Sequence, residues 1–501
     1  MKLTCDTAGW SRRPLFLTAL LLVAVTAAGA GLLFAWRAAP QNWSRQPLRN
    51  ALTAQVVRPA DWAELTLAGG PGGNDWVLLP PQPQQNTPFR SAVTGAQRGF
   101  LAPQDCVDCH ADYCETFQHT SHARTSMLPS AKSILGSLQP GRNLLTTARP
   151  ELQFRMHSLD GKIVQTVELQ DPQLRTVFTD SFPIDLVFGS GNHGQSYLWW
   201  NGDQLYQAHV SYLSESDAWV NSPGPYYDGT ADFARPVPVR CMECHVTWIA
   251  ADPQEMNRFD RSTLVPGVTC VRCHGPAHEH VAFHRQHPAE TQGKRIVNPA
   301  GLSIERQNEI CAQCHSAGEE HASLFGYRPG EPLQQWLQLD LSAAAETNAD
   351  PHAANQLARL MQSPCFQQSG GFACTLCHDP HQNQRDGAAS FAQHCRSCHQ
   401  QNSCPDVQHE NTGSLAAERC VACHMPARRD AQVAIQTRQG NIEALLRDHQ
   451  IGIWPDAAAE ERRRLETSLR QALQQPAHST PANQPQDRQP GSDQPQEGTA
   501  K

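Results

Sequence analysis

The chain has 501 residues, of which 39% are hydrophobic, and a formal net charge of −8. No basic patch stands out in this mildly acidic sequence, so nucleic acid is not an expected partner. It also contains 18 cysteines, most of which fall into one repeated pattern.

The N-terminal segment is the most apolar part of the chain. Residues 14–36 carry no charge, and as a helix they would span roughly 34 Å, enough to cross a hydrocarbon core of about 30 Å. Lys2, Arg12 and Arg13 precede them, and the positive-inside rule then leaves the N-terminus in the cytoplasm. We therefore expect a signal anchor over residues 1–37, a single pass through the cell inner membrane, and the rest of the chain on the periplasmic side.

A cleavable signal peptide is the alternative, because small residues at 28–30 could form a cleavage site. Apolar residues continue beyond that site as far as Trp36, which favours the uncleaved anchor. Residues 38–100 follow and are rich in Pro, Gly and Gln. This composition predicts a tether between the membrane and the rest of the protein.

The pattern Cys-x-x-Cys-His occurs seven times. The seven motifs are Cys106-Cys109-His110, Cys241-Cys244-His245, Cys270-Cys273-His274, Cys311-Cys314-His315, Cys374-Cys377-His378, Cys395-Cys398-His399 and Cys420-Cys423-His424. Composition alone predicts about 0.03 accidental matches. Two such cysteines can form thioethers with the vinyl groups of a haem, and the adjacent histidine can bind the iron. The sequence therefore predicts seven covalent haem c groups, with the motif histidines as proximal ligands.

Zinc is the competing interpretation, because pairs of Cys-x-x-Cys also build tetrahedral zinc sites. Such sites do not require a histidine directly after the second cysteine, whereas each of the seven pairs here has one. Haem attachment is therefore the favoured interpretation.

The segment between the first and second motifs differs from the rest. Residues 151–170 resemble two strands around Asp160-Gly161, and residues 195–200 with 204–212 resemble a hairpin that turns at Asn201-Gly202. We predict a small β-rich insert at about residues 150–235. Its aromatic side chains are expected to be packing rather than a substrate site: Tyr197, Trp199, Trp200, Tyr206 and Tyr212.

The last six motifs are crowded between Cys241 and His424, so the haems that they predict must be close enough to form an electron path. Macrocycles would also supply buried apolar surface. We predict a heptahaem domain over residues 101–430 whose fold is mainly α and irregular and haem-cored, with the β-rich insert and the N-terminal transmembrane helix. Residues 431–475 are predicted to be a helical extension, with a helix over 456–475, and residues 476–501 a disordered tail.

Six segments around the motifs form a recognisable set. They are Cys106-Val-Asp-Cys-His110 with Phe117 and His122-Ala123; Gly189-Ser-Gly-Asn-His193-Gly; Gly267-Val-Thr-Cys270-Val-Arg-Cys-His-Gly-Pro276; Cys365 with Ser369-Gly-Gly371; Cys374-Thr-Leu-Cys-His-Asp-Pro-His381; and Cys420-Val-Ala-Cys-His-Met-Pro426. Over about residues 101–452 the chain thus resembles multihaem cytochromes related to the cytochrome c-552/c-554 domain. In that family the Phe117 position is usually Trp, and some members continue into tetratricopeptide repeats, which do not follow here.

The resemblance implies a haem-bearing electron carrier whose donor and acceptor are other redox proteins. Some relatives are catalytic and act on nitrite, tetrathionate or hydroxylamine, but the Cys-x-x-Cys-Lys motif of pentahaem nitrite reductase does not occur here. We therefore expect an exported, membrane-anchored cytochrome that transfers electrons in a respiratory or redox chain, and we assign no catalytic residue. The alternative is an oxidoreductase with one open haem that acts on a small nitrogen or sulfur compound.

Distal ligands decide between these two functions, because a haem with two histidine ligands is closed to substrate. Matches to the family's motifs favour five distal ligands: His122, His193, His280, His381 and His449. Eight further histidines are reserves: His119, His209, His278, His284, His321, His352, His394 and His409.

Three cysteines in the same region lie outside every motif. Cys365 and Cys404 are either a disulfide or two thiols, and both interpretations stay open at this stage. Cys114 has no obvious partner in the sequence.

Overall fold

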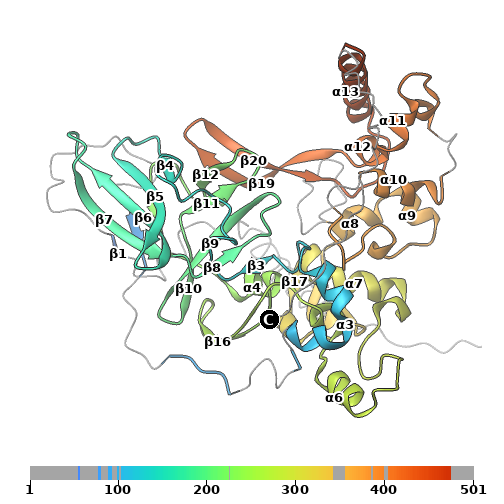
Figure 1. Cartoon of the computed structure of the whole chain (residues 1–501), viewed down its shortest axis with the longest axis horizontal. Helices are drawn as coiled ribbons and strands as arrows, with labels where there is room; N and C mark the ends of the chain where they lie inside the picture. The colour runs from blue at the N-terminus through green and yellow to red at the C-terminus, as the bar shows by residue number, and fades with distance from the viewer. Residues whose placement is uncertain are drawn as a thin grey trace, which may run out of the picture.

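The computed structural model describes residues 55–56, 77–80, 88–92, 99–100, 103–224, 226–341, 356–384, 388–399 and 404–474. Figure 1 shows two regions: the strands of residues 144–221 gather on one side, and the short helices that carry most of the Cys-x-x-Cys-His motifs gather on the other.

The first sheet of the β-rich part is antiparallel, with its four strands side by side in chain order. They are β4 (Leu144–Thr146), β5 (Leu152–Leu159), β6 (Lys162–Gln170) and β7 (Thr176–Pro183). Asp160 and Gly161, with φ of 48° and 77°, make the tight turn between β5 and β6. The predicted pair of strands around Asp160-Gly161 is confirmed.

The second sheet has seven strands in the order β12-β11-β9-β10-β14, with β8 joining β9 to β3. Their bounds are β3 (Ser126–Met127), β8 (Leu186–Phe188), β9 (Gly194–Asn201), β10 (Gln204–Gln207), β11 (Val210–Leu213), β12 (Ala218–Asn221) and β14 (Arg235–Pro236). Leu205 pairs with Trp200, so the predicted hairpin at Asn201-Gly202 is confirmed. The strand predicted over 204–212 is divided, because β10 pairs with the end of β9 and β11 with its start.

Aromatic side chains from both sheets form the main core. Phe182 and Phe233 stack with ring centroids 3.7 Å apart, and Phe154 stacks on the buried His209 at 4.5 Å. All five aromatic residues predicted to be packing are at most 9% exposed, which confirms that prediction: Tyr197, Trp199, Trp200, Tyr206 and Tyr212.

Part of the range predicted as a tether is built into the fold. β1 (Gln55–Val56) pairs with β2 (Val77–Leu79), and β2 pairs with β13 (Ala231–Asp232) in a small sheet. The chain before the first motif is therefore tied to the β-rich part at these strands.

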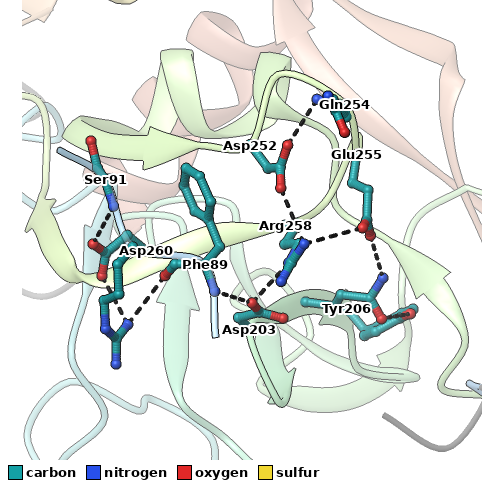
Figure 2. Close-up of polar contacts among 11 residues, drawn as sticks. Phe89, Ser91, Asp203, Tyr206, Asp252, Gln254, Glu255, Arg258 and Asp260 are labelled. Atoms are coloured by element: carbon teal, nitrogen blue, oxygen red, sulfur yellow. Dashed lines mark hydrogen bonds and ion pairs between the residues drawn. The ribbon is translucent and has the colours of Figure 1, made fainter. Parts of the chain in front are cut away.

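Residues 88–92 are held against the second sheet by an acidic cluster (Figure 2). The Phe89 backbone N–H donates to Asp203 at 2.6 Å, and the Ser91 N–H donates to Asp260 at 3.0 Å. Arg258 lies between Asp203 and Asp252, at 2.8 and 3.2 Å, and neutralises part of the negative charge. These hydrogen bonds thus hold residues 88–92, which belong to the segment that the sequence predicts to be a tether.

The motif-bearing part consists of short helices and two small hairpins. The α-helices are α3 (Gln104–Phe117), α4 (Val239–His245), α5 (Val271–His274), α6 (His278–Gln286), α7 (Ile304–His315), α8 (Gln356–Met361), α9 (Pro364–Gln368), α10 (Ala388–Arg396), α11 (Gly413–Ala417) and α12 (Cys420–His424). The 3₁₀ turns are η3 (Pro299–Gly301), η4 (Leu324–Gly326), η5 (Leu333–Gln335), η7 (Cys374–Leu376) and η9 (Pro405–Gln408). The hairpins are β15 (Val246–Ala251) with β16 (Phe259–Pro266), and β17 (Gly318–Glu320) with β18 (Leu337–Leu339).

A long antiparallel hairpin joins the two regions. It is formed by β19 (Ala427–Thr437) and β20 (Gly440–Arg447), and in Figure 1 it extends from the motif-bearing part back to β11 and β12. The Asn221 amide on β12 donates to the Gln436 carbonyl at 2.6 Å. The final helix, α13 (Pro455–Gln474), lies where the sequence predicts a helix over 456–475.

The predicted fold class is wrong, because strands and helices contribute about equally and several sheets are present. Strands occur well outside the predicted insert, in β15 to β20, and much of the predicted helical extension is the β19–β20 hairpin. Polar residues such as Arg428, Arg429 and Gln436 make that hairpin look unlike a strand, since the apolar alternation that reveals a half-buried strand is weak there.

The predicted membrane helix, the membrane as a partner and the inner-membrane location also need correction. Within the described ranges, no helix combines the length and the apolar composition that crossing a membrane requires. Residues 14–36, on which that prediction was based, lie outside the described residues, as do residues 476–501 of the predicted disordered tail.

Replacing Phe154 by Ala should destabilise the β-rich part by about 3–5 kcal/mol, because the change leaves a cavity in the core. Phe154 is 0% exposed, whereas Leu128 is 61% exposed, so Leu128→Ala is a matched control with an expected change within about 0.5 kcal/mol. Native-state hydrogen exchange of peptides from β5 and β6 measures both. Equal protection of β5 and β6 in the two variants would contradict the assignment of this core.

Candidate functional site

Four pairs of histidine rings have nearly the same separation. The ring centroids are 6.3 Å apart for His110 and His280, 6.0 Å for His274 and His381, 6.1 Å for His378 and His449, and 6.2 Å for His122 and His315. Each pair combines one motif histidine with one histidine from outside the motifs. A metal–imidazole bond is about 2.0 Å long and the ring centre lies about 1.1 Å behind the nitrogen, so two imidazoles on one iron have centres about 6 Å apart. The four separations match that arrangement.

The second members of these pairs are four of the five histidines predicted to be distal ligands. The structure brings His122, His280, His381 and His449 each to one motif histidine. His193 is exposed on the connection between β8 and β9, where its carbonyl accepts a hydrogen bond from the Ser214 N–H at 2.9 Å. Iron ligation stays a prediction for all five.

Backbone carbonyls orient several of these rings. Nδ1 of His274 donates to the Val297 carbonyl at 3.0 Å, Nδ1 of His280 to the Lys294 carbonyl at 2.8 Å, and Nδ1 of His449 to the Arg447 carbonyl at 3.2 Å. A neutral imidazole that donates from Nδ1 presents the lone pair of Nε2, which is the arrangement found for histidines that bind metals.

Two further motif histidines are oriented in the same way. His245 donates from Nδ1 to the Thr125 carbonyl at 3.2 Å, and His424 donates to the Gly452 carbonyl at 2.8 Å. The His245 ring also stacks on Phe188, with centroids 4.4 Å apart. Such carbonyl acceptors have no signature in the sequence, because any residue can provide them.

Burial keeps two predicted distal ligands neutral. Desolvation lowers the pKa of His122 to about 4 and that of His449 to about 4. A neutral imidazole is what an axial ligand requires, since only the unprotonated nitrogen can bind iron.

The helix α7 lies at the junction of four motifs. Its Asn308 amide donates to the Phe372 carbonyl at 3.0 Å, and the Asn308 side-chain oxygen accepts from the Cys374 N–H at 2.8 Å. Gln313 on the same helix donates to the Arg272 carbonyl at 3.3 Å, and the Cys314 thiol lies 3.9 Å from the Glu243 carbonyl. The motif that ends at His315 is thus in contact with the second, third and fifth motifs.

Thiols of different motifs also lie close together. In four cysteine pairs the neighbouring thiol raises the pKa of the first member: Cys106 beside Cys270, Cys244 beside Cys314, Cys311 beside Cys374, and Cys395 beside Cys420. Together with the α7 contacts, these pairs place neighbouring motifs side by side through most of the motif-bearing part.

Buried polar atoms without a hydrogen-bond partner provide a test of whether a haem fits. They include Arg272 Nε, Ser316 Oγ and Tyr327 Oη, which are in or close to the third and fourth motifs. Such donors suit the propionate groups of a haem, because a buried donor left unsatisfied costs about 1–3 kcal/mol. The residues present therefore fit haem at this place.

The remaining candidate residues have other environments. His209 is buried and uses both ring nitrogens within the protein, with Asn221 at 3.0 Å and the Asp232 N–H at 3.0 Å, so it is a core residue and not a ligand. Cys365 and Cys404 are both free cysteines, so of the two alternatives the structure contains the two thiols. The reserve ligand His352 lies outside the described residues.

Comparisons with known proteins agree with these observations. Residues 193–275 match the family model described as cytochrome c554 and c-prime. The match covers 83 of the 501 residues and contains His193 and the second and third motifs. Over that segment the chain is similar to a family of cytochromes.

The chain was also compared with curated proteins and with solved structures. No curated protein matches the chain. Among solved structures, the one titled "Crystal Structure of Outer Cell Wall Cytochrome OcwA" is similar to 72% of this chain and 81% of that chain, with 15% identity and a TM-score of 0.46.

Replacing His280 by Ala should leave every haem covalently attached, because no motif residue changes. It should convert one haem from low-spin to high-spin, because the iron beside His110 loses its second imidazole. His287→Ala is the control, since His287 is exposed one residue beyond α6. Optical and paramagnetic resonance spectra measure the spin state, and identical spectra for His280→Ala and the parent protein would exclude this ligand.

Proposed function

We propose that the chain is a heptahaem cytochrome that carries electrons between a donor and an acceptor redox protein. The observation that supports this most strongly is the set of four histidine pairs, each at 6.0–6.3 Å between ring centroids. Two histidines per iron leave no coordination position for a substrate, so these haems can only accept and donate electrons.

The protein's part in electron transfer is to hold the haems close together. His280 follows the third motif in sequence but pairs with the first, and His381 follows the fifth motif but pairs with the third. A histidine that follows one motif in the chain and binds the iron of another motif holds the two motifs close together. Adjacent redox centres held in this way form a path whose potentials depend on ligands and local dielectric.

The contacts of α7 support a branched path. The third and fifth motifs connect through α7, and the second motif touches the same helix at Glu243. We infer that the haem held by Cys311, Cys314 and His315 is the junction. In this path the haem of the first motif connects to the junction through the haem of the third motif. The haems of the sixth and seventh motifs lie beyond that of the fifth. The contact of α10 with α12 and the proximity of Cys377 to Cys395 support this order.

The alternative function, an oxidoreductase with an open haem, depends on the other three motif histidines. These are His245, His399 and His424. A small nitrogen or sulfur compound could bind only where that position lacks a protein ligand.

Paramagnetic resonance of the oxidised holoprotein separates the two functions. We expect low-spin ferric signals of two kinds, because the ring planes are within 23° of parallel in three pairs but 80° apart for His122 and His315. The near-perpendicular pair should give the more anisotropic signal, and His122→Ala should remove it selectively. A high-spin signal that changes when nitrite or hydroxylamine is added would instead support the oxidoreductase.

The number of haems can be tested by intact mass spectrometry of the purified protein. The mass should exceed that of the polypeptide by seven haem groups, one for each motif. Replacing Cys420 and Cys423 together by Ala should lower the count by one, whereas Cys114→Ala should leave it unchanged because Cys114 lies outside every motif. A smaller count in the parent protein would contradict the heptahaem assignment.

A further inference from the structure

A buried ion pair lies beside one of the predicted ligands. Arg359 on α8 donates from Nε to Asp448 Oδ1 at 2.9 Å and from Nη2 to Oδ2 at 2.5 Å. The two side chains are 1% and 0% exposed, respectively. This bidentate geometry is the most directional that an arginine and a carboxylate can adopt.

Asp448 also forms hydrogen bonds with residues that precede it and follow it in the chain. Its Oδ1 also accepts the Gln450 N–H at 2.9 Å, and its Oδ2 accepts a hydrogen bond from Arg428 at 3.1 Å. Its own N–H donates to the Pro426 carbonyl at 3.0 Å. The short segment that follows β20 therefore has a fixed backbone.

His449 is the residue between these anchored positions. Its carbonyl accepts a hydrogen bond from the Ser363 hydroxyl at 3.3 Å, and that hydroxyl accepts the Ile451 N–H at 2.8 Å. Its ring is 6.1 Å from that of His378, between centroids. The segment around His449 is thus attached to the α8–α9 region, which precedes the fifth motif directly in the chain.

The ion pair is poorly explained by stability alone. Burying two charges costs several kcal/mol per ion, and well-packed apolar residues often replace a buried pair without loss of stability. The pair instead fixes an orientation, because its two parallel hydrogen bonds hold the segment around His449 in one position relative to α8. A ligand that must meet an iron at about 2.0 Å needs such a constraint.

We propose that Arg359 and Asp448 are positioning residues that hold His449 as the distal ligand of the haem attached through Cys374 and Cys377. This inference rests on the proposed function, in which His378 and His449 bind one iron. Neither Arg359 nor Asp448 touches the iron, and both act through the backbone of His449.

Asp448→Asn tests the proposal in the complete holoprotein. Asparagine keeps the shape of the side chain, but it removes the negative charge that faces Arg359 and replaces one of the two acceptor oxygens by an amide nitrogen, which cannot accept a hydrogen bond. We expect unchanged haem content and a high-spin fraction that appears in one haem and binds carbon monoxide when reduced. Arg359→Lys keeps the charge but not the two parallel hydrogen bonds, so it should show a smaller high-spin fraction.

Two further variants separate positioning from stability. The double variant Arg359→Met with Asp448→Leu removes both charges of the buried pair together, and Arg428, which also contacts Asp448, is 27% exposed and can be solvated instead, so the fold should be retained. If the pair positions His449, this variant should still show the high-spin fraction; a fully low-spin spectrum in the folded double variant would overturn the proposal. The surface pair of Arg464 and Glu460, 65% and 55% exposed, supplies the control Glu460→Gln, which should leave all spectra unchanged.

His449→Ala distinguishes failure of this proposal from failure of the proposed function. It should convert the same haem completely to high-spin. If His449→Ala has no effect, the ligand assignment itself is wrong. If His449→Ala acts as expected but Asp448→Asn does not, the ligand assignment holds and the positioning role of the ion pair is excluded.

Discussion

Under the proposed function, pairs of histidines from distant parts of the chain impose the main constraint on this fold. His110 and His280 are joined across the whole β-rich insert, and His122 and His315 span an even longer stretch of sequence. With an iron between each pair, such contacts become crosslinks, and a crosslink that closes a long loop removes more entropy from the unfolded chain than one that closes a short loop. The short helices α9 to α12 can then hold their places, although none of their residues belongs to the hydrophobic clusters that α4, α5, α7 and α8 help to form.

The two regions of the molecule depend on different forces. The β-rich part is held by an aromatic core in which Phe154 and Tyr197 are fully buried, as in an ordinary soluble domain. The β19–β20 hairpin connects this part to the motif-bearing part, since Asn221 contacts Gln436 near the hairpin's turn and Asp448 with His449 follows β20 directly. The hairpin thus couples a region stabilised by side-chain packing to one end of the proposed electron path.

Local patterns in the sequence predicted the features that depend on a few neighbouring residues. The Cys-x-x-Cys-His motifs are of this kind, as are the turns at Asp160-Gly161 and Asn201-Gly202, which the structure contains. The partner of each motif histidine could not be predicted, because His280 follows the third motif and nothing in its neighbourhood indicates that it pairs with the first. The pair formed by Arg359 and Asp448 was missed for the same reason: each looks like a surface residue until α8 and the end of β20 are brought together.

The C-terminal third of the motif-bearing part has few buried apolar side chains. Over residues 362–474, within the described part of that range, the buried hydrophobic side chains are Ala392, Ile435 and Leu465. Full burial of one large apolar side chain contributes about 1.5–3 kcal/mol, which for three residues is far below the conformational entropy cost of ordering so long a segment. Three of the seven motifs lie in this range, so three macrocycles can provide the apolar surface that side chains do not. This deficit bears on the proposed function: if these three motifs carry haem, attachment of the haems should precede or accompany folding of the segment.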